Sequence, residues 1–483
     1  MLFNSAVFLK FFGAFLLLYW LVRNHLTARN LLIVASSYLF YFWWVVDRDF
    51  TFHGWYDWRF LALMIFTSLL DFSIGLGLDR LQQPRPRRLL LAASVAGNLT
   101  ILGVFKYHGF FVANLAGVLA RVGIHVPTPT LQLILPLGIS FYTFQSMSYT
   151  IDVYRRQMPA TRNLVSFLAF VAFFPQLVAG PIERASHLLP QFAQTRVITW
   201  AMMEEGVWLM LRGLFKKVVL ADNFAPLADL VFQNTTWSAP TVVLGTTAFA
   251  LQIYCDFSGY SDIARGTARV LGFDIMVNFN RPYGATGLRD FWRRWHISLS
   301  TWLRDYLYVP LGGNRRGPAR TLVNLLVTML LGGLWHGAAW NFVLWGAWHG
   351  GGLIVQRVFA SRSDSTGVKP AAPIEGILSW TATMAFVSYG WLLFRARSLQ
   401  QVFDMTRALG EFKSPDWMGS FALNLLVFGA LLAALEIWEA KSGPRLAPFL
   451  LPAWARIAIS GVLILAIVLF WVKQQAPFIY FQF

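Results

Sequence analysis

Charged residues are scarce in this sequence. Asp, Glu, Lys and Arg make up 13% of its 483 residues, whereas a soluble domain carries about 25%. Hydrophobic residues account for 57%, and the mean hydropathy is +0.53. This composition excludes an ordinary soluble globular protein and predicts an all-α polytopic membrane protein.

Cysteine occurs only once, as Cys255. A single cysteine rules out an internal disulfide and any metal cluster built on several cysteines. Its thiol could still act as a nucleophile that forms a thioester. A lone cysteine in an apolar run, however, is far more often a small buried hydrophobic residue.

Acidic residues are also few, since 23 Asp and Glu stand against 40 Lys and Arg, for a formal net charge of +17. In a soluble protein this excess would suggest nucleic acid as a partner. No soluble basic module is present in the sequence, so we expect no nucleic acid. Membrane lipids are the expected partner, through positive-inside loops and anionic head groups.

Several catalytic motifs are missing. No Walker-type loop with GK[ST] is present, and the stretch Gly259–Ile263 lacks the second glycine of a nucleophile elbow. No H-x-x-x-H or H-E-x-x-H pair is present, so we expect no metal. The N-terminus lacks a basic region and a cleavage site, which predicts a retained first span rather than a signal peptide.

Apolar runs of spanning length recur along the chain. They lie near 5–22, 30–46, 58–78, 89–105, 131–151, 163–182, 241–256, 321–338, 340–357, 375–394, 420–438 and 455–472. More polar stretches at 109–121, 205–221 and 288–308 are expected to be interfacial or re-entrant. We therefore expect roughly 10–12 crossings.

One integral-membrane domain is predicted over 1–483. Its catalytic core is expected at about 131–357, with peripheral helices at 1–130 and 375–483, and the segment Ser361–Pro373 as a linker.

The charges of the first loops predict the orientation. Loops 23–29 and 79–88 are rich in arginine, whereas loop 47–57 between them is mainly acidic. The positive-inside rule then places the N-terminus on the outer, periplasmic side of the membrane.

Residues 289–308 combine charge with aromatic rings. Taken as one helix, they form an aromatic stripe of Phe291, Trp295, Leu299, Trp302 and Tyr306, and a polar stripe of Arg289, Arg293, His296, Ser300 and Arg304. Such a helix would lie along the membrane surface or line a cavity. The simpler alternative is an interfacial anchor whose arginines extend to the head groups.

His336 and His349 lie in a run, 321–356, that has no Asp, Glu, Lys or Arg. As one helix this run would extend about 54 Å, too long for a single crossing, so it must break or reverse. A titratable residue in a lipid-spanning run is a site hypothesis, although it could also be a structural histidine bonded between helices. His349 falls on a different face and is expected to have a structural or secondary role.

Glycines flank His336, namely Gly332, Gly333 and Gly337. We expect them to let two backbones pack closely and to loosen the helix around the imidazole.

Long ordered motifs then point to a family. They are FWRRWHISLSTWLRDYLYVPLGGN at 291–314, MLLGGLWHGAAWNFVLWGAWHG at 329–350, SSYLFYFWW at 36–44, LPLGISFYTFQSMSYTIDVYRR at 135–156, FFPQLVAGPIER at 173–184, YCDFSGYSDIARG at 254–266, NFNRPY at 278–283 and FIYFQF at 478–483. The sequence resembles the membrane-bound O-acyltransferase (MBOAT) family. Within it, the sequence is most similar to the bacterial branch that O-acetylates exopolysaccharides such as alginate.

This resemblance implies a ring of tilted transmembrane helices around a central tunnel. It implies that His336 is the family's invariant catalytic histidine, and that His296 occupies a second polar position held by His or Asn. Candidate substrate-binding residues are Arg289, Arg293, Arg294, Trp295, Ser300, Arg304, Trp335 and Asn341. The donor is expected to be acetyl-CoA or another acyl thioester, with no permanently bound cofactor.

The implied reaction is acyl transfer. His336 would remove the proton of an acceptor hydroxyl, and His296 would orient the acceptor or stabilise the oxyanion. Acetyl would cross the bacterial inner membrane to a periplasmic SGNH-type acetyltransferase, within a polysaccharide synthase and export complex. The alternatives are D-alanyl transfer toward teichoic acid, or a non-enzymatic transporter or scaffold of such a complex.

Overall fold

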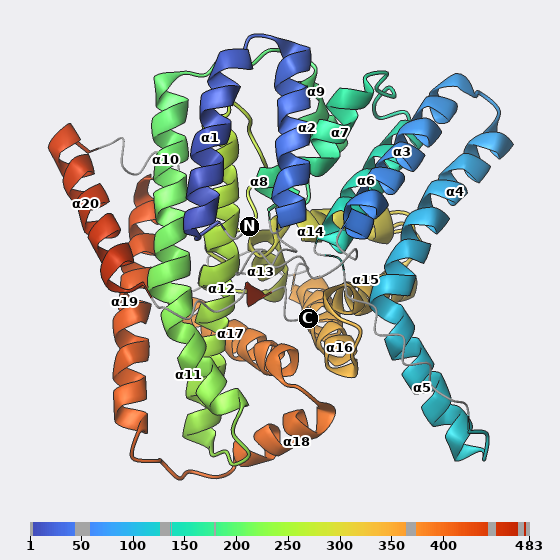
Figure 1. Ribbon diagram of the computed structural model, residues 1–483. Helices are drawn as coiled ribbons and strands as arrows, with labels where there is room; N and C mark the ends of the chain where they lie inside the picture. The colour runs from blue at the N-terminus through green and yellow to red at the C-terminus, as the bar shows by residue number, and fades with distance from the viewer. Residues whose placement is uncertain are drawn as a thin grey trace. The chain divides into compact units, whose positions relative to one another are not determined.

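The computed structural model describes residues 3–43, 58–125, 136, 138–177, 180–363, 373–442, 451–471 and 478–479. Within these ranges the regular secondary structure is helical throughout and contains no strand, which confirms the all-α class (Figure 1). The acidic loop 47–57 and residues 364–372 of the predicted linker lie outside the described residues.

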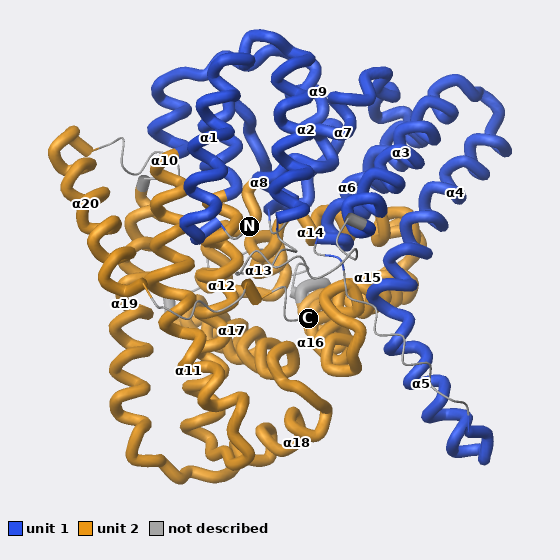
Figure 2. Tube along the Cα trace, in the orientation of Figure 1, with its two compact units in different colours: residues 1–206, 264–276 blue, residues 207–263, 277–483 orange. Residues whose placement is uncertain are grey.

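The helices form two compact units. The first unit comprises Met1–Gly206 and Ala264–Met276, and the second comprises Val207–Ile263 and Val277–Phe483 (Figure 2). The candidate residues at 289–349 all belong to the second unit.

The first unit begins with nine α-helices and one π-helical turn. Their bounds are α1 Ala6–Val22, α2 Leu26–Trp43, α3 Trp58–Arg80, α4 Pro84–Leu102, η1 Gly103–Tyr107, α5 His108–Arg121, α6 Ile139–Tyr154, α7 Leu164–Ala172, α8 Phe174–Leu177 and α9 Ala185–Phe192. Asn163 caps α7 by accepting a hydrogen bond from the Ser166 N–H (2.9 Å). The predicted run 163–182 is broken at Phe173, between α7 and α8, and Pro175 in the first turn of α8 has no N–H to continue the bonding of α7.

A buried carboxylate joins three helices of the first unit. Asp71 on α3 accepts hydrogen bonds from the Ser94 hydroxyl (2.6 Å) and the Asn98 amide (2.9 Å) of α4. The Ser146 hydroxyl of α6 also donates to Asp71. These donors satisfy a carboxylate that is fully buried within a candidate membrane span.

The second unit contains the remaining elements, with α10 beginning and α12 ending in the first unit. Their bounds are α10 Trp200–Leu214, η2 Phe215–Ala221, α11 Asp222–Phe232, α12 Ala239–Val270, η3 Pro282–Gly284, α13 Leu288–Arg294, α14 Ile297–Leu303, η4 Arg304–Tyr308, α15 Pro318–His336, α16 Trp340–Ser363, α17 Pro373–Arg395, α18 Leu399–Ala408, α19 Met418–Ser442 and α20 Ala453–Leu469. Among these, α15 and α16 pack along each other as a helical hairpin.

The hairpin confirms that the uncharged run 321–356 is broken. α15 ends at His336, Gly337 is extended (φ −164°), and α16 begins at Trp340. A Cβ on Gly333 would lie 2.2 Å from the Phe342 carbonyl oxygen, and one on Gly346 would lie 2.4 Å from the Met329 carbonyl oxygen. Only glycine permits this approach of the two backbones, as the sequence predicts.

Five helical segments in the described part of the chain are long and apolar enough to cross a membrane: Arg59–Arg80, Pro84–Arg121, Pro318–His336, Ile374–Arg395 and Met418–Lys441. Three shorter apolar segments are Ala6–Val22, Leu164–Leu177 and Ala453–Leu469. The stretch 109–121 continues α4 through the π-helical turn η1 into one segment of 38 residues, and its interfacial or re-entrant position stays a prediction. The chain is therefore a multi-pass membrane protein.

Candidate active site

The expected single helix over 289–308 is wrong. The chain forms α13, then a break at Trp295 and His296, then α14, which runs into the π-helical turn η4. His296 has φ +41° and ψ +56°, a left-handed conformation that ends any continuous helix. The aromatic stripe matched helical spacing because each short helix buries its own apolar side chains, which periodicity alone cannot distinguish from one long helix.

A second segment of backbone holds this break. The Asn280 N–H donates to the Arg294 carbonyl oxygen (3.0 Å), and the Ile297 N–H donates to the Asn278 carbonyl oxygen (2.9 Å). These two hydrogen bonds lie on either side of His296. The turn is thus built by segment 278–280, which belongs to the NFNRPY stretch.

His296 is fully buried against aromatic rings. Its ring lies edge-to-face on Phe257 of α12 (centroids 4.7 Å apart) and on Trp335 of α15 (5.9 Å). His296 lies outside the five candidate spans, and burial lowers its pKa to about 3. The imidazole is therefore neutral at pH 7 and has one N–H donor and one acceptor nitrogen.

His336 is the last residue of α15, and 5% of its surface is exposed. Its ring packs edge-to-face on Trp335 (5.1 Å), Trp345 (5.1 Å) and Phe394 (5.2 Å). His296 and His336 therefore both contact the Trp335 indole, and the structure brings the two predicted catalytic histidines to one aromatic side chain.

His349 is buried among other rings. It contacts Trp345 (4.8 Å) and Trp292 (5.2 Å), and a Cβ on Gly390 would lie 2.6 Å from its Nε2. Whether His349 has a structural or a secondary role stays a prediction.

The four predicted arginines differ in their surroundings. Arg289 and Arg293 are exposed on α13, and the Arg289 backbone N–H donates to the Gln356 side chain (2.9 Å). Arg294 forms an ion pair with Asp290 (2.9 Å), and Arg304 is exposed and pairs with Asp305 (2.7 Å). Their role in binding the donor stays a prediction.

The other predicted substrate-binding residues have structural contacts of their own. The Ser300 hydroxyl donates to the Trp295 carbonyl oxygen (3.1 Å), and the Asn341 amide donates to the Ala396 carbonyl oxygen (3.0 Å). Trp295 is almost fully buried against Trp391 (4.7 Å). Whether these three residues or Trp335 also touch substrate stays a prediction.

A cluster of buried ion pairs in the second unit was not predicted from the sequence. Lys217 of η2 pairs with Asp222 (2.7 Å) and with Asp256 of α12 (2.8 Å). The Ile479 backbone N–H also donates to Asp256 (2.7 Å), and the neighbouring Phe478 ring packs on Tyr260 (4.4 Å). This places part of the FIYFQF stretch in the core of the second unit.

A second set of pairs lies one turn away on the same helical segment. Arg212 pairs with Asp262, and with Glu439 of α19 (2.6 Å), and Lys216 also reaches Asp262 (3.2 Å). The sequence signal for these pairs was the presence of Lys and Arg within apolar segments, because a charged side chain there needs a partner of opposite charge. Sequence alone could not tell which carboxylates supply them.

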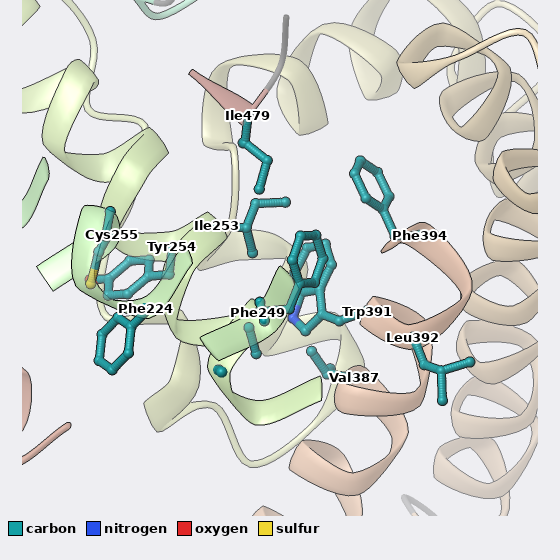
Figure 3. Close-up of a cluster of buried hydrophobic side chains, with 14 of the residues drawn as sticks. Phe224, Phe249, Ile253, Tyr254, Cys255, Val387, Trp391, Leu392, Phe394 and Ile479 are labelled. Atoms are coloured by element: carbon teal, nitrogen blue, oxygen red, sulfur yellow. The ribbon is translucent and has the colours of Figure 1, made fainter. Parts of the chain in front are cut away.

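Cys255 is completely buried in a hydrophobic cluster that also contains Tyr254 and Phe224, and it lies on α12 with Tyr254 (Figure 3). This environment matches a small buried hydrophobic residue rather than an accessible nucleophile. Across the residues that the structure describes, no three His, Cys, Asp or Glu side chains are grouped so that they could hold a metal ion.

Comparison with known proteins places these features in a family. Residues 152–396 match the membrane-bound O-acyltransferase family, a range that includes both His296 and His336. A probable alginate O-acetylase of Pseudomonas putida is 40% identical over 512 aligned residues, covering 100% of both chains. One from Pseudomonas aeruginosa is 44% identical over 85% of this chain and 75% of its own.

A peptidoglycan O-acetyltransferase of Helicobacter pylori is 34% identical over 85% of this chain and 80% of its own. Together with the family match, these similarities show that the chain belongs to the membrane-bound O-acyltransferase family and is an O-acyltransferase.

Proposed function

We propose that this protein transfers an acetyl group from a cytoplasmic acyl thioester, acetyl-CoA, and passes it across the bacterial inner membrane for O-acetylation of an exopolysaccharide such as alginate or cellulose. The observation that carries the proposal is the shared contact of His336 and His296 with Trp335. The names of the similar proteins, alginate O-acetylase and peptidoglycan O-acetyltransferase, support acetyl as the group transferred.

His336 acts as the general base in this proposal. The oxygen of the acceptor hydroxyl attacks the thioester carbonyl carbon while His336 takes the hydroxyl proton. The resulting oxyanion is stabilised by the N–H of the neutral His296 ring. The intermediate then collapses with loss of the thiolate, which takes the proton from His336.

The proposed acceptor pathway involves a partner. In this proposal, a periplasmic SGNH-type acetyltransferase, acting with a polysaccharide synthase and export complex, receives the acetyl group. Arg289, Arg293, Arg294 and Arg304 are proposed to contact donor phosphates, because arginine forms paired hydrogen bonds with phosphate.

The test uses the purified protein in proteoliposomes with radiolabelled acetyl-CoA outside and the proposed acceptor, a purified SGNH-type acetyltransferase, inside. General acid–base catalysis contributes about 10²–10⁴-fold to a rate, so His336→Ala should lower the rate of label transfer by about 10²-fold or more. His25→Ala, at an exposed residue of the first unit, is the matched control and should keep the parental rate. Parental transfer by purified, correctly inserted His336→Ala would disprove the catalytic assignment.

A parallel reaction with a D-alanyl-loaded carrier protein separates the two donor classes. Transfer of D-alanine in place of acetyl would replace the proposal by the teichoic acid alternative. Acetylation of polymer by this chain alone, with no partner added, would disprove the relay.

A further inference from the structure

We propose that Asn278 is a positioning residue for His296, which it holds at a left-handed turn through its side chain and backbone. This inference rests on the proposed role of His296 in acyl transfer. Asn278 lies outside the two helices that flank His296, and it contacts the chain on the C-terminal side of that turn.

The turn needs external support. A residue other than glycine in the left-handed region costs about 1–3 kcal/mol and persists only where the surrounding structure over-determines it. His296 has φ +41° and is fully buried. Its imidazole direction is therefore set by whatever holds the backbone in this conformation.

The backbone of Asn278 supplies part of this support. Its carbonyl oxygen accepts the Ile297 N–H (2.9 Å), directly after His296. Two residues on, the Asn280 N–H donates to the Arg294 carbonyl oxygen (3.0 Å), two residues before His296. Both ends of the turn are thus tied to segment 278–280.

The Asn278 side chain supplies the helix cap that His296 does not. The first N–H groups of a helix have no partner within the helix and need an acceptor from elsewhere. His296 occupies the N-cap position of α14 without a capping side-chain bond. Asn278 Oδ1 accepts both the Ser298 N–H (3.3 Å) and the Ser298 hydroxyl (2.7 Å) instead.

The other polar atom of the Asn278 side chain connects this cap to α12. Its Nδ2 donates to the Ser261 hydroxyl (3.2 Å), and Asn278 itself is buried, with 1% of its surface exposed. Phe257, one turn earlier on α12, is the residue whose ring contacts His296 at 4.7 Å. Asn278 therefore links the backbone of the turn to the helix against which the imidazole packs.

This arrangement predicts an effect on turnover rather than on donor binding. A displacement of about 1 Å in a catalytic group can lower a rate by about 10²-fold. Asn278→Ala should lower kcat at least tenfold and leave the KM for acetyl-CoA within twofold. Asn278→Asp keeps the Oδ1 acceptor but loses the Nδ2 donor to Ser261, so it should recover only part of the lost kcat.

Two further variants make the test independent of folding defects at position 278. Ser298→Ala removes one of the two donors to Asn278 Oδ1 and should lower kcat about threefold, since the backbone N–H bond remains. Thr301→Val is the matched control. The Thr301 hydroxyl donates to the Ile297 carbonyl within α14 (2.8 Å), so its loss should leave kcat unchanged.

Parental kcat in Asn278→Ala, or an equal loss in Asn278→Ala and Asn278→Asp, would overturn the inference. If Asn278→Ala does not insert as a monodisperse protein, the Ser298→Ala variant is used instead. A kcat of Ser298→Ala equal to that of Thr301→Val would then overturn the inference.

His296→Gly separates this inference from the proposed function. Glycine adopts positive φ without strain, so this variant removes the imidazole and leaves the turn intact. Parental activity in His296→Gly would remove the role of His296 and the inference with it. Loss of activity in His296→Gly and His336→Ala, with parental kcat in the Asn278 variants, would overturn the inference alone.

Discussion

The two candidate histidines are surrounded by aromatic side chains. Trp335, Trp345 and Phe394 pack edge-to-face on His336, and Phe257 and Trp335 pack edge-to-face on His296. Each such aromatic pair contributes about 0.5–1.5 kcal/mol beyond the area that it buries. These contacts restrict how far either imidazole can rotate, which suits groups that must meet a reacting atom in one orientation.

Trp335 is the residue that the two histidines share. Sequence reasoning included it as a substrate-binding candidate, and its contacts with both imidazoles are the structural reason to keep it as one. Its position directly before His336 on α15 means that the two side chains point to different sides of the helix. One turn of helix therefore presents both the Trp335 indole and the His336 imidazole.

His187 in the first unit has an acid partner that changes its titration. Its Nδ1 lies 2.9 Å from the carboxylate of Glu183, which is fully buried, while the His187 side chain is 41% exposed. The hydrogen bond to Glu183 raises the pKa of His187. A histidine with a raised folded pKa stabilises the protein below about pH 6.5, and this contribution is lost as the pH rises through the raised value.

We therefore expect the apparent pKa of His187 to exceed 6.5, and Glu183→Gln to lower it. Histidine-selective acylation at a series of pH values, followed by mass spectrometry of the His187 peptide, measures this pKa in the parent and in Glu183→Gln. Exposed His25 serves as the internal reference for reagent reactivity. Identical His187 profiles in the parent and Glu183→Gln would contradict the role of the carboxylate.

At the scale of elements, glycine sets the distance between α10 and α12. A Cβ on Gly213 would lie 2.5 Å from the Gly259 carbonyl oxygen and 2.7 Å from Ile263 Cγ1. This close crossing, followed at once by the π-helical turn η2, lets Lys216 and Lys217 reach carboxylates of α12. π-helical turns often occur at functional positions in helices.

Gly213→Ala should therefore destabilise the protein. The added methyl group must separate two backbones, and overpacking of this kind costs about 1–3 kcal/mol, with further loss if the Arg212–Asp262 and Lys216–Asp262 pairs lengthen. The midpoint of thermal unfolding in detergent micelles measures the change, and it should fall.

Gly461→Ala on α20 is the control for this substitution. A Cβ there would meet nothing within 4 Å, so alanine should leave stability unchanged or raise it by about 0.5–1 kcal/mol. Equal thermal midpoints for the Gly213 and Gly461 variants would mean that the crossing tolerates a side chain.

Element boundaries show where pattern reasoning succeeds and fails. The break at Gly337 was predictable, because one helix of that length exceeds the membrane and glycines stand at the required place. The break at His296 was not, because the sequence of 289–308 fits a continuous helix. Only the hydrogen bonds from segment 278–280 make a left-handed histidine favourable there.

At the scale of the whole molecule, the net charge is +17. We therefore expect anionic lipids around the protein to increase its free energy of unfolding. Basic residues near a membrane surface gain about 1 kcal/mol each from anionic lipid. We expect a higher thermal midpoint in nanodiscs of phosphatidylglycerol than in nanodiscs of phosphatidylcholine. This gain should shrink in about 1 M salt, where the Debye length is about 3 Å. Equal midpoints in the two lipids would contradict an electrostatic contribution.

The sequence by itself determined the membrane class, the uncharged run with a broken helix, the two histidines and the family. These follow from composition, from apolar length and from long continuous motifs, which are properties of single segments. The orientation across the membrane and the division into core and peripheral helices stay predictions from the same kind of evidence.

Tertiary structure alone decided which residues meet. The pairing of Lys217 with Asp256, the cap that Asn278 provides for α14, and the shared contact of His296 and His336 with Trp335 all join segments distant in sequence. Buried charges and helix ends require partners, but any of several carboxylates or amides would satisfy that requirement equally well. The choice among them depends on which helices approach each other, and this is a property of the folded chain.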